Sequence, residues 1–221
     1  MNKKILIAII VILAISIAGT AVYYAFLGQD TSAKGTLVVQ SNVSGVTVTI
    51  LGPEETIKTG ITGANGEVTF TGLPLGTYTG IATKEGYNPH YIMEISKKYA
   101  GSTTLPITMT IDDSGGAAFN PTSNPAALII KQGSTGTTTV TIPSAGFTGA
   151  VSLSCTQLPS GVTATFDPAS ITFTDNAKVT STLTLKASST ATKGTYNFIL
   201  IHLSNEEGSM SSVFGLLLQV T

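Results

Sequence analysis

The chain has 221 residues, a formal net charge of -1 and only 10% charged residues, and all 11 of its basic residues are lysines. A near-neutral chain without arginine has neither the basic surface nor the guanidinium groups that bind nucleic acid, so we expect no nucleic-acid partner. Its single cysteine excludes an internal disulfide, so core burial and sheet hydrogen bonds must stabilise the fold.

The first predicted element is an apolar run from Ile5 to Leu27, which follows Lys3 and Lys4. A helix over this run would be about 34 Å long, enough to cross a hydrocarbon core of about 30 Å. Because the lysines precede the run, the positive-inside rule places the N-terminus in the cytoplasm and the remaining chain outside. We therefore predict one transmembrane helix within residues 1–28 and a single-pass plasma-membrane protein with extracellular C-terminal domains.

The same segment has features of a cleavable signal peptide. Small residues stand at signal-peptidase spacing in Ser16–Ala18 and Gly19–Ala21, and cleavage there would give a secreted protein. Against cleavage, the apolar character continues to Leu27, and Tyr23 and Tyr24 lie where an interfacial aromatic belt would lie. An uncleaved anchor is favoured, and cleavage is the alternative.

Residues 29–34 form a short polar stalk, and a β-rich segment follows at residues 35–111. Its strands alternate apolar residues with threonine or other polar residues, which is typical of half-buried strands. Between two of them, the pair Asn65-Gly66 suits the positive φ of a hairpin turn. The predicted strands are Thr36–Gln40, Val46–Ile50, Glu67–Phe70, Thr77–Thr83, Tyr91–Ser96 and Thr104–Ile111.

Residues 112–125 are rich in Gly, Pro, Ser and Asn and are predicted to be a linker, before a second β-rich segment at residues 126–221. The strands predicted there are Ala127–Ile130, Thr137–Ile142, Val151–Cys155, Val162–Phe166, Ser170–Thr174, Thr180–Ala187, Thr195–Leu203 and Met210–Val220. Regularly spaced strands without a helical pattern between them predict an all-β protein. We expect two antiparallel β-sandwich domains in tandem behind the N-terminal transmembrane helix.

Both β-rich segments contain Gly-Thr-Tyr at the start of a strand, ending at Tyr78 and at Tyr196. This pattern predicts tyrosine corners, in which the ring packs on the sandwich and the hydroxyl bonds to nearby backbone. Alternation places Cys155 on the same face as Val151 and Leu153 and predicts a buried, unreactive thiol, with intermolecular pairing as the alternative.

The first segment resembles the prealbumin-type modules known as PEGA and carboxypeptidase-regulatory-like domains. The matching text is Gly35–Val39, Gly45–Ile50, Thr62–Gly66, Phe70–Tyr78 and Lys84–Tyr87. The resemblance implies a small non-enzymatic β-sandwich on a cell surface or appended to an exported protein. Related pilus modules form a Lys–Asn isopeptide bond, but Gln40 and Ala82 stand where its lysine and acid would be expected, so that crosslink is not predicted.

The second segment resembles the Ig-like repeats of microbial surface and secreted proteins. The matching text is Gly146–Gly149, Leu153–Cys155, Leu158–Thr163 and Phe166–Ser170. Relatives often have a second cysteine where this chain has Ala164, so the family disulfide is absent. Both resemblances concern architecture rather than a task.

No residue set in the sequence predicts catalysis. Asp113–Gly116 is similar to a serine-protease nucleophile segment, but it lies in the predicted linker, where a flexible spacer explains the same residues. His90 and His202 fall in different domains, and the adjacent acid pairs lack the interleaved spacing of calcium loops. We expect no enzyme, no metal and no cofactor, with calcium at a domain junction as the weaker alternative.

The loop around Gly86–Tyr91 is the candidate contact surface because it carries aromatic and polar residues together: Tyr87, Asn88, His90 and Tyr91. A turn with a core tyrosine is the plainer interpretation of the same residues. Asn42-Val43-Ser44 matches the acceptor pattern for N-glycosylation.

These features predict a non-catalytic, membrane-anchored surface protein that presents two sandwiches for binding or adhesion. Its partner would be an unknown surface polymer or protein, and it is a possible homo-oligomer. Two alternatives stay open: a structural subunit of a surface fibre assembled by strand exchange, and a binding accessory to an exported enzyme.

Overall fold

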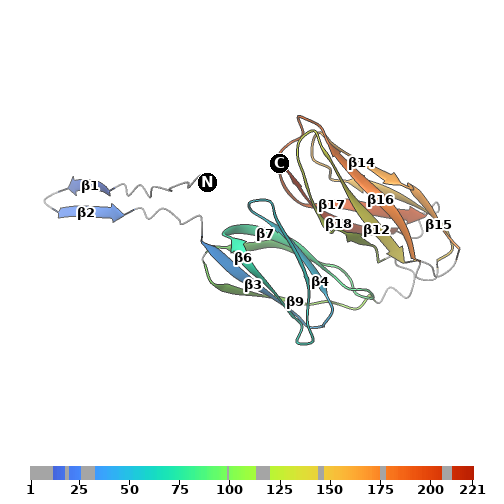
Figure 1. The fold of residues 1–221 in the computed structure, drawn as a ribbon, viewed down its shortest axis with the longest axis horizontal. Helices are drawn as coiled ribbons and strands as arrows, with labels where there is room; N and C mark the ends of the chain where they lie inside the picture. Colours follow the sequence, from blue (N-terminus) through green and yellow to red (C-terminus); the bar gives the residue numbers. More distant parts are fainter. Residues whose placement is uncertain are drawn as a thin grey trace, which may run out of the picture. The chain divides into compact units, whose positions relative to one another are not determined.

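The computed structural model describes residues 12–17, 20–25, 33–98, 100–112, 120–143, 147–174, 178–205 and 211–221. All the regular elements in these ranges are strands, which confirms the all-β prediction for this part of the chain (Figure 1). The chain divides into two compact units, Met1–Ala33 and Lys34–Thr221.

The first unit contains a hairpin where the sequence predicts a helix. β1 (Ile12–Ile17) pairs antiparallel with β2 (Thr20–Ala25), so these residues do not form the helix predicted from Ile5 to Leu27. The other residues of that range lie outside the described ones. The physical reason is composition, because β-branched and aromatic residues fill much of both strands and favour extended backbone. Among the described residues, no helix is long and apolar enough to span a membrane.

The second unit begins with a sandwich of two sheets, ordered β6-β3-β9 and β5-β4-β7-β8. Its strands are β3 (Lys34–Ser41), β4 (Thr47–Gly52), β5 (Thr56–Ile61), β6 (Glu67–Pro74), β7 (Gly76–Thr83), β8 (His90–Lys97) and β9 (Ser102–Ile107). The two inner faces enclose a hydrophobic core that includes Leu37, Val48, Phe70 and Tyr78. Alternation of apolar and polar residues therefore gives the expected half-buried strands, and Asn65-Gly66 forms the predicted turn with Gly66 at φ +78°.

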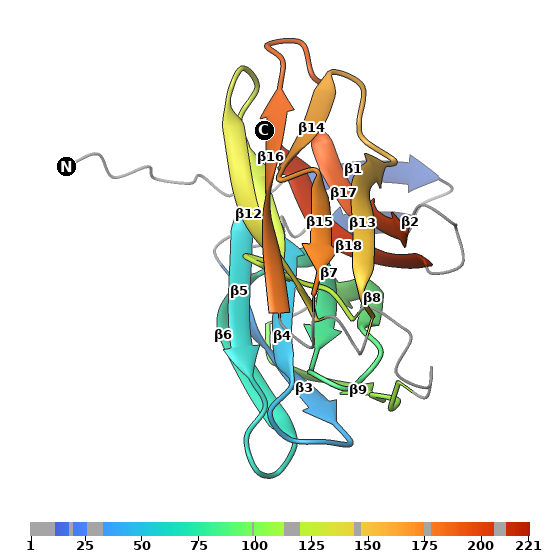
Figure 2. The same cartoon turned by 90° about the vertical axis from the view of Figure 1, so that its right-hand side faces the viewer.

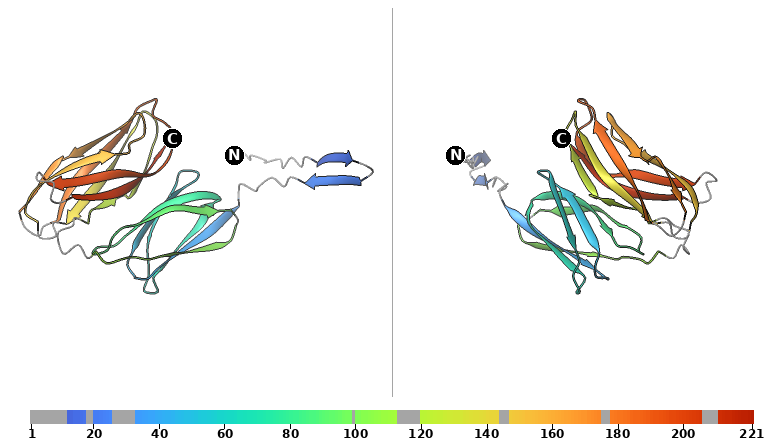
Figure 3. Two further views of the ribbon diagram at one scale, coloured as in Figure 1. Left: turned by 180° about the vertical axis from the view of Figure 1, so that it is seen from behind. Right: turned by 45° about the vertical axis from the view of Figure 1, so that its right-hand side comes forward.

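A second sandwich follows, with sheets ordered β10-β12-β16-β14 and β11-β18-β17-β13-β15. Its strands are β10 (Thr122–Asn124), β11 (Ala127–Ile130), β12 (Thr135–Pro143), β13 (Gly149–Thr156), β14 (Val162–Asp167), β15 (Ser170–Phe173), β16 (Lys178–Ala187), β17 (Gly194–Asn205) and β18 (Ser211–Val220). Its core is larger than the first and includes Val140, Phe173, Leu185 and Ile201. Figure 3 shows the sheets from two further directions.

Each sandwich contains one parallel strand pair, in contrast to the purely antiparallel pairing expected from the sequence. β3 runs parallel to β9, and β11 runs parallel to β18. In both cases an early strand of the sandwich lies beside its last strand, and the chain between them crosses from one sheet to the other.

The region predicted to be a linker is partly structured. β10 lies within residues 112–125 and pairs with β12, so it belongs to the second sandwich. Residues 113–119 of this region lie outside the described ones. The residues on either side are joined, because Asn120 Nδ2 donates a 2.5 Å hydrogen bond to the Asp112 carboxylate.

Candidate functional site

The two sandwiches of the second unit meet through a third hydrophobic cluster. Its buried members are Leu51, Ile81, Ala127 and Leu217, and its partly buried members are Ile57, Tyr91, Ala126, Ile129 and Phe198. These residues come from β4, β5, β7 and β8 on one side and from β11, β17, β18 and Ala126, just before β11, on the other. The sequence contains a signal for this junction in the unbroken run Leu216-Leu217-Leu218, because a strand buried on both faces loses its alternation.

Tyr91 is the polar anchor of the junction. Its ring meets the Phe198 ring edge to face, with centroids 4.7 Å apart and an interplanar angle of 74°. Its hydroxyl oxygen accepts a 2.9 Å hydrogen bond from the Gly215 backbone N–H, and burial raises the pKa of Tyr91. A nearby bond of 3.4 Å runs from Asn197 Nδ2 to the Met93 carbonyl. The junction therefore combines apolar burial with directional contacts that fix one arrangement.

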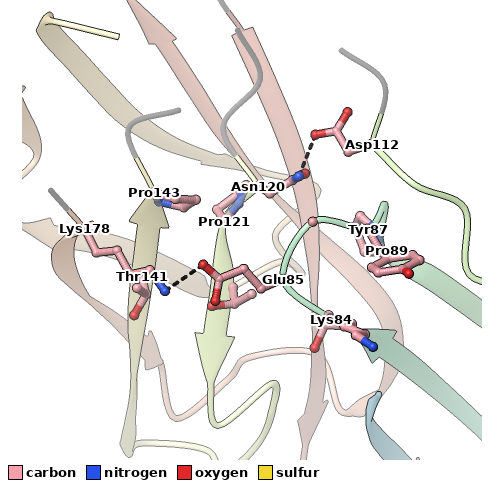
Figure 4. Close-up of a pocket in the computed structure, with 13 residues that line it drawn as sticks. Lys84, Glu85, Tyr87, Pro89, Asp112, Asn120, Pro121, Thr141, Pro143 and Lys178 are labelled. Atoms are coloured by element: carbon pink, nitrogen blue, oxygen red, sulfur yellow. Dashed lines mark hydrogen bonds and ion pairs between the residues drawn. The ribbon is translucent and has the colours of Figure 1, made fainter. Parts of the chain in front are cut away.

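A groove of about 260 Å³ is lined by residues of both sandwiches (Figure 4). It is lined by Thr83, Lys84, Glu85, Gly86, Tyr87, Pro89 and Asp112 from the first sandwich and its end, and by Asn120, Pro121, Thr122, Thr141, Pro143 and Lys178 from the second. Tyr87 and the prolines give apolar surface, while threonine hydroxyls and one amide give uncharged hydrogen-bonding groups. Both sandwiches are needed to form it.

The charged groups of the groove are balanced in sign, and each contacts a neighbouring residue. Lys178 Nζ lies 2.9 Å from Glu85 Oε1, which links the two sandwiches through well-exposed side chains. Lys84 Nζ lies 5.2 Å from the centre of the Tyr87 ring, a cation–π contact, and donates a 2.6 Å bond to the Ser44 carbonyl. The lining contains two lysines, Lys84 and Lys178, and two acids, Glu85 and Asp112, so the groove has no net charge. The Asp112 carboxylate accepts the hydrogen bond from Asn120.

The four residues of the predicted contact loop are separated by the structure. Tyr87 lines the groove, whereas Tyr91 belongs to the hydrophobic junction. Asn88 ties the loop to the end of the first sandwich, since its backbone N–H donates a 2.9 Å bond to the Thr110 carbonyl. His90 opens β8 opposite Ala82. A contact role for the loop stays a prediction, and Tyr87 is the member that lies in the groove.

The predicted glycosylation site, Asn42, is an exposed residue whose amide is already bonded. Its Nδ2 donates a 3.0 Å bond to the Met109 carbonyl, and its Oδ1 accepts a 2.8 Å bond from the Met109 N–H. A glycan would be attached at Nδ2, so modification of the folded chain would have to break the first of these bonds. Glycosylation therefore stays a prediction.

In the ranges that the structure describes, no three His, Cys, Asp or Glu side chains gather at metal-binding distance. Glu54 and Glu55, one of the adjacent acid pairs, lie in a turn. His202, one of the two histidines considered as metal ligands, bonds through Nε2 to the Thr156 hydroxyl at 2.6 Å. The protease-like string Asp113–Gly116 lies outside the described residues.

Comparison with known proteins agrees with the resemblance of the first sandwich. Residues 32–110 match the carboxypeptidase regulatory-like domain family, which confirms that the resemblance read from residues 35–111 is correct at the family level. No curated protein matches the chain.

Several solved structures of surface proteins are similar at low identity. The major pilin subunit of Bacillus cereus is 14% identical with a TM-score of 0.30, and the match covers 86% of this chain and 69% of that one. The major pilin SpaD of Corynebacterium diphtheriae is 12% identical with a TM-score of 0.32, covering 87% and 67%. The surface layer protein SbsC is 14% identical with a TM-score of 0.31, covering 91% and 23%. TM-scores of this size do not establish a shared role.

Proposed function

We propose that this chain is a non-catalytic surface protein whose groove between the two sandwiches binds an uncharged, hydroxyl-rich segment of a surface polymer, such as a glycan chain. The observation that carries this proposal is the lining of the groove. It pairs the apolar surfaces of Tyr87, Pro89, Pro121 and Pro143 with hydroxyl and amide groups and has no net charge.

The chemistry of a neutral glycan matches this lining. Ligand sites usually combine apolar walls with a few fixed polar groups that set orientation. A sugar ring has a C–H face, which packs against an aromatic ring or a proline, and hydroxyls, which both donate and accept hydrogen bonds. The hydrogen bond between Asn120 and Asp112 orients the one amide of the lining before a ligand arrives, which lowers the entropy lost on binding.

Charge balance separates a neutral glycan from other polymers. A strongly anionic polymer would need an excess of basic groups, and the two lysines of the groove are offset by Glu85 and Asp112. An acidic surface polymer is therefore expected to bind more weakly than a neutral one of the same length.

Surface location is part of the same proposal and rests on the apolar run from Ile5 to Leu27 behind Lys3 and Lys4. In a bilayer, an isolated hairpin leaves backbone groups at its outer edges without partners, whereas a helix satisfies them all. We infer that the segment directs export and takes a helical form when it enters a membrane. N-terminal sequencing of the mature protein distinguishes an intact tether from cleavage after Ala18 or Ala21.

Glycan binding is tested by calorimetric titration of the purified chain with neutral and acidic oligosaccharides. Thr141→Arg places a long side chain in the groove and is expected to weaken the affinity for a neutral glycan by at least about tenfold, or 1.4 kcal/mol. Thr137→Arg is the matched control, because Thr137 is an exposed residue on the same strand outside the groove lining. Equal binding by the two variants, or no binding of any neutral glycan, would refute the groove as the site.

The fibre alternative, in which an exposed strand of one copy completes the sheet of the next, stays a prediction. β18 lies between β11 and β17 and is hydrogen-bonded to both, so its exchange would require the strand of another copy to re-form both ladders. Electron microscopy of the concentrated protein tests this alternative, because persistent monomers would contradict it. A role as accessory to an exported enzyme stays a prediction that co-purification from membranes would test.

A further inference from the structure

Among the described edge strands of the second unit, β14 is the one whose interior, Val162 to Phe166, carries no feature that blocks further pairing. Edge strands expose unpaired backbone groups, and proteins usually protect them by short length, charge, proline or a bulge. β14 ends the sheet ordered β10-β12-β16-β14 and has six residues, Val162–Asp167 (Figure 2).

The other edge strands of the second unit each carry a protecting feature. β10 has three residues, and β11 and β15 have four each. β5 contains Lys58, and β9 contains Pro106. The pairing of β6 with β3 and of β8 with β7 is interrupted by register shifts, and exposed Glu94 adds a charge to β8.

β14 has the composition of a strand that pairs. From Val162 to Phe166 it has no charge, glycine or proline, and its first charged residue is the terminal Asp167. Val162 is buried, while Ala164 and Phe166 are only partly buried although they pack against the hydrophobic core. The open edge therefore leaves apolar surface of this core in contact with solvent.

We propose that β14 is a self-association surface, on which β14 of a second copy pairs antiparallel so that the two four-stranded sheets become one. The register that places Ala164 opposite Ala164 of the second copy keeps core-facing residues opposite core-facing residues. It sets Val162 opposite Phe166 and Thr163 opposite Thr165. A pair of an aromatic and a β-branched residue and a pair of two threonines both stabilise neighbouring antiparallel strands.

The proposed pairing also avoids electrostatic repulsion. In this register Asp167 faces Gly161, and no charged residue faces another across the new ladder. A second copy therefore covers Phe166 and pairs the open backbone groups without burying a charge. Because the same strand is used on both sides, the assembly closes as a two-fold dimer and does not extend into a fibre.

The test is cross-linking of the full chain in mild detergent, with Cys155→Ser to remove the native thiol. Directly opposed residues have Cβ atoms about 4.5–5.5 Å apart, so Ala164→Cys should give a covalent dimer with a short thiol cross-linker. Thr172→Cys is the matched control, because Thr172 is exposed on the edge strand β15. Equal dimer yields from the two cysteines, or none from Ala164→Cys, would overturn the proposal.

Introducing charged residues at Thr163 and Thr165 gives an independent test of the register. Adding Thr163→Glu and Thr165→Glu to the Ala164→Cys chain places acid opposite acid twice across the two-fold axis, and we expect the dimer yield to fall at least about tenfold. Thr163→Glu with Thr165→Lys places acid opposite base at the same positions and should restore it. Because Thr163 lies opposite Lys186 on β16, glutamate there is compatible with the monomer. Loss of the dimer in both double variants would contradict the proposed register.

Discussion

Each sandwich contains one tyrosine corner, and the two corners are built in the same way. The Tyr78 hydroxyl donates a 2.7 Å bond to the Pro74 carbonyl, and the Tyr196 hydroxyl donates a 2.9 Å bond to the Thr192 carbonyl. Both bonds reach back four residues, as the repeated Gly-Thr-Tyr pattern predicts, so both tyrosine corners are confirmed. The sequence does not reveal that Tyr78 is 1% exposed whereas Tyr196 is only partly buried.

This difference predicts unequal costs for the same substitution. Tyr78→Phe leaves the buried Pro74 carbonyl without its partner and should lower the free energy of unfolding by about 1–3 kcal/mol. Tyr196→Phe should cost less than about 1 kcal/mol, because water can replace the hydroxyl at a site that solvent reaches. Urea denaturation of the two variants measures both values, and equal losses would show that burial of the bond does not decide its contribution.

Cys155 lies on the core-facing side of β13, as alternation predicts, and is partly buried. Burial raises the pKa of its thiol to about 11, so the reactive thiolate is scarce at neutral pH. This environment favours the unreactive thiol over the intermolecular disulfide.

The pKa of Cys155 predicts a pH profile for alkylation of the folded chain. Raising the pH from 7 to 10 should increase the rate with iodoacetamide about tenfold per unit, because the thiolate fraction keeps rising below the pKa. In urea the rate should level off above about pH 9, as it does for an ordinary thiol with a pKa of about 8.5. A folded-state rate that levels off near pH 9 would show that Cys155 is not shielded.

At the scale of elements, local patterns located most strands but missed those with unusual turns or ends. β5 was not predicted, since the turn before it contains Glu54 at φ 53° and Glu55 at φ 56° rather than Asn-Gly. Non-glycine residues rarely take this conformation, so no turn signal marks the hairpin. β10 was not predicted because it lies in a segment with the composition of a linker, and a strand of three residues is too short to show the alternation of apolar and polar residues.

Pairing between distant strands was less accessible to sequence reasoning than strand position. A period of two gives the face of each residue but not the identity of its neighbour, so the parallel pairs β3–β9 and β11–β18 were not expected. The hairpin of β1 and β2 was not predicted for a related reason. A long apolar run is compatible with a helix or with two strands, and length alone favoured the helix.

At the scale of the second unit, the junction was the least predictable feature. Leu51, Ile81 and Leu217 each occupy a strand whose neighbouring residues are also buried. The loss of alternation around Leu217 indicates burial on both faces of its strand, but it does not identify the residues that cover the outer face. The outward faces of these three residues meet one another only because the two sandwiches pack together. The groove, which needs lining from both sandwiches, follows from that packing and could not be derived from either segment alone.

The hydrophobic junction predicts that a substitution in one sandwich lowers the local stability of the other. Tyr91→Ala, in β8, removes the ring contact to Phe198 and the acceptor of the Gly215 N–H. An edge-to-face aromatic pair contributes about 0.5–1.5 kcal/mol beyond area burial, and the unpaired N–H adds to the loss. Hydrogen exchange followed by mass spectrometry should therefore show reduced protection in β18, in the opposite sandwich. Met93→Ala on the same strand is the control, because Met93 is 59% exposed and outside the cluster. If exchange in β18 is the same in both variants, the sandwiches fold independently and the groove between them is not held in a fixed shape.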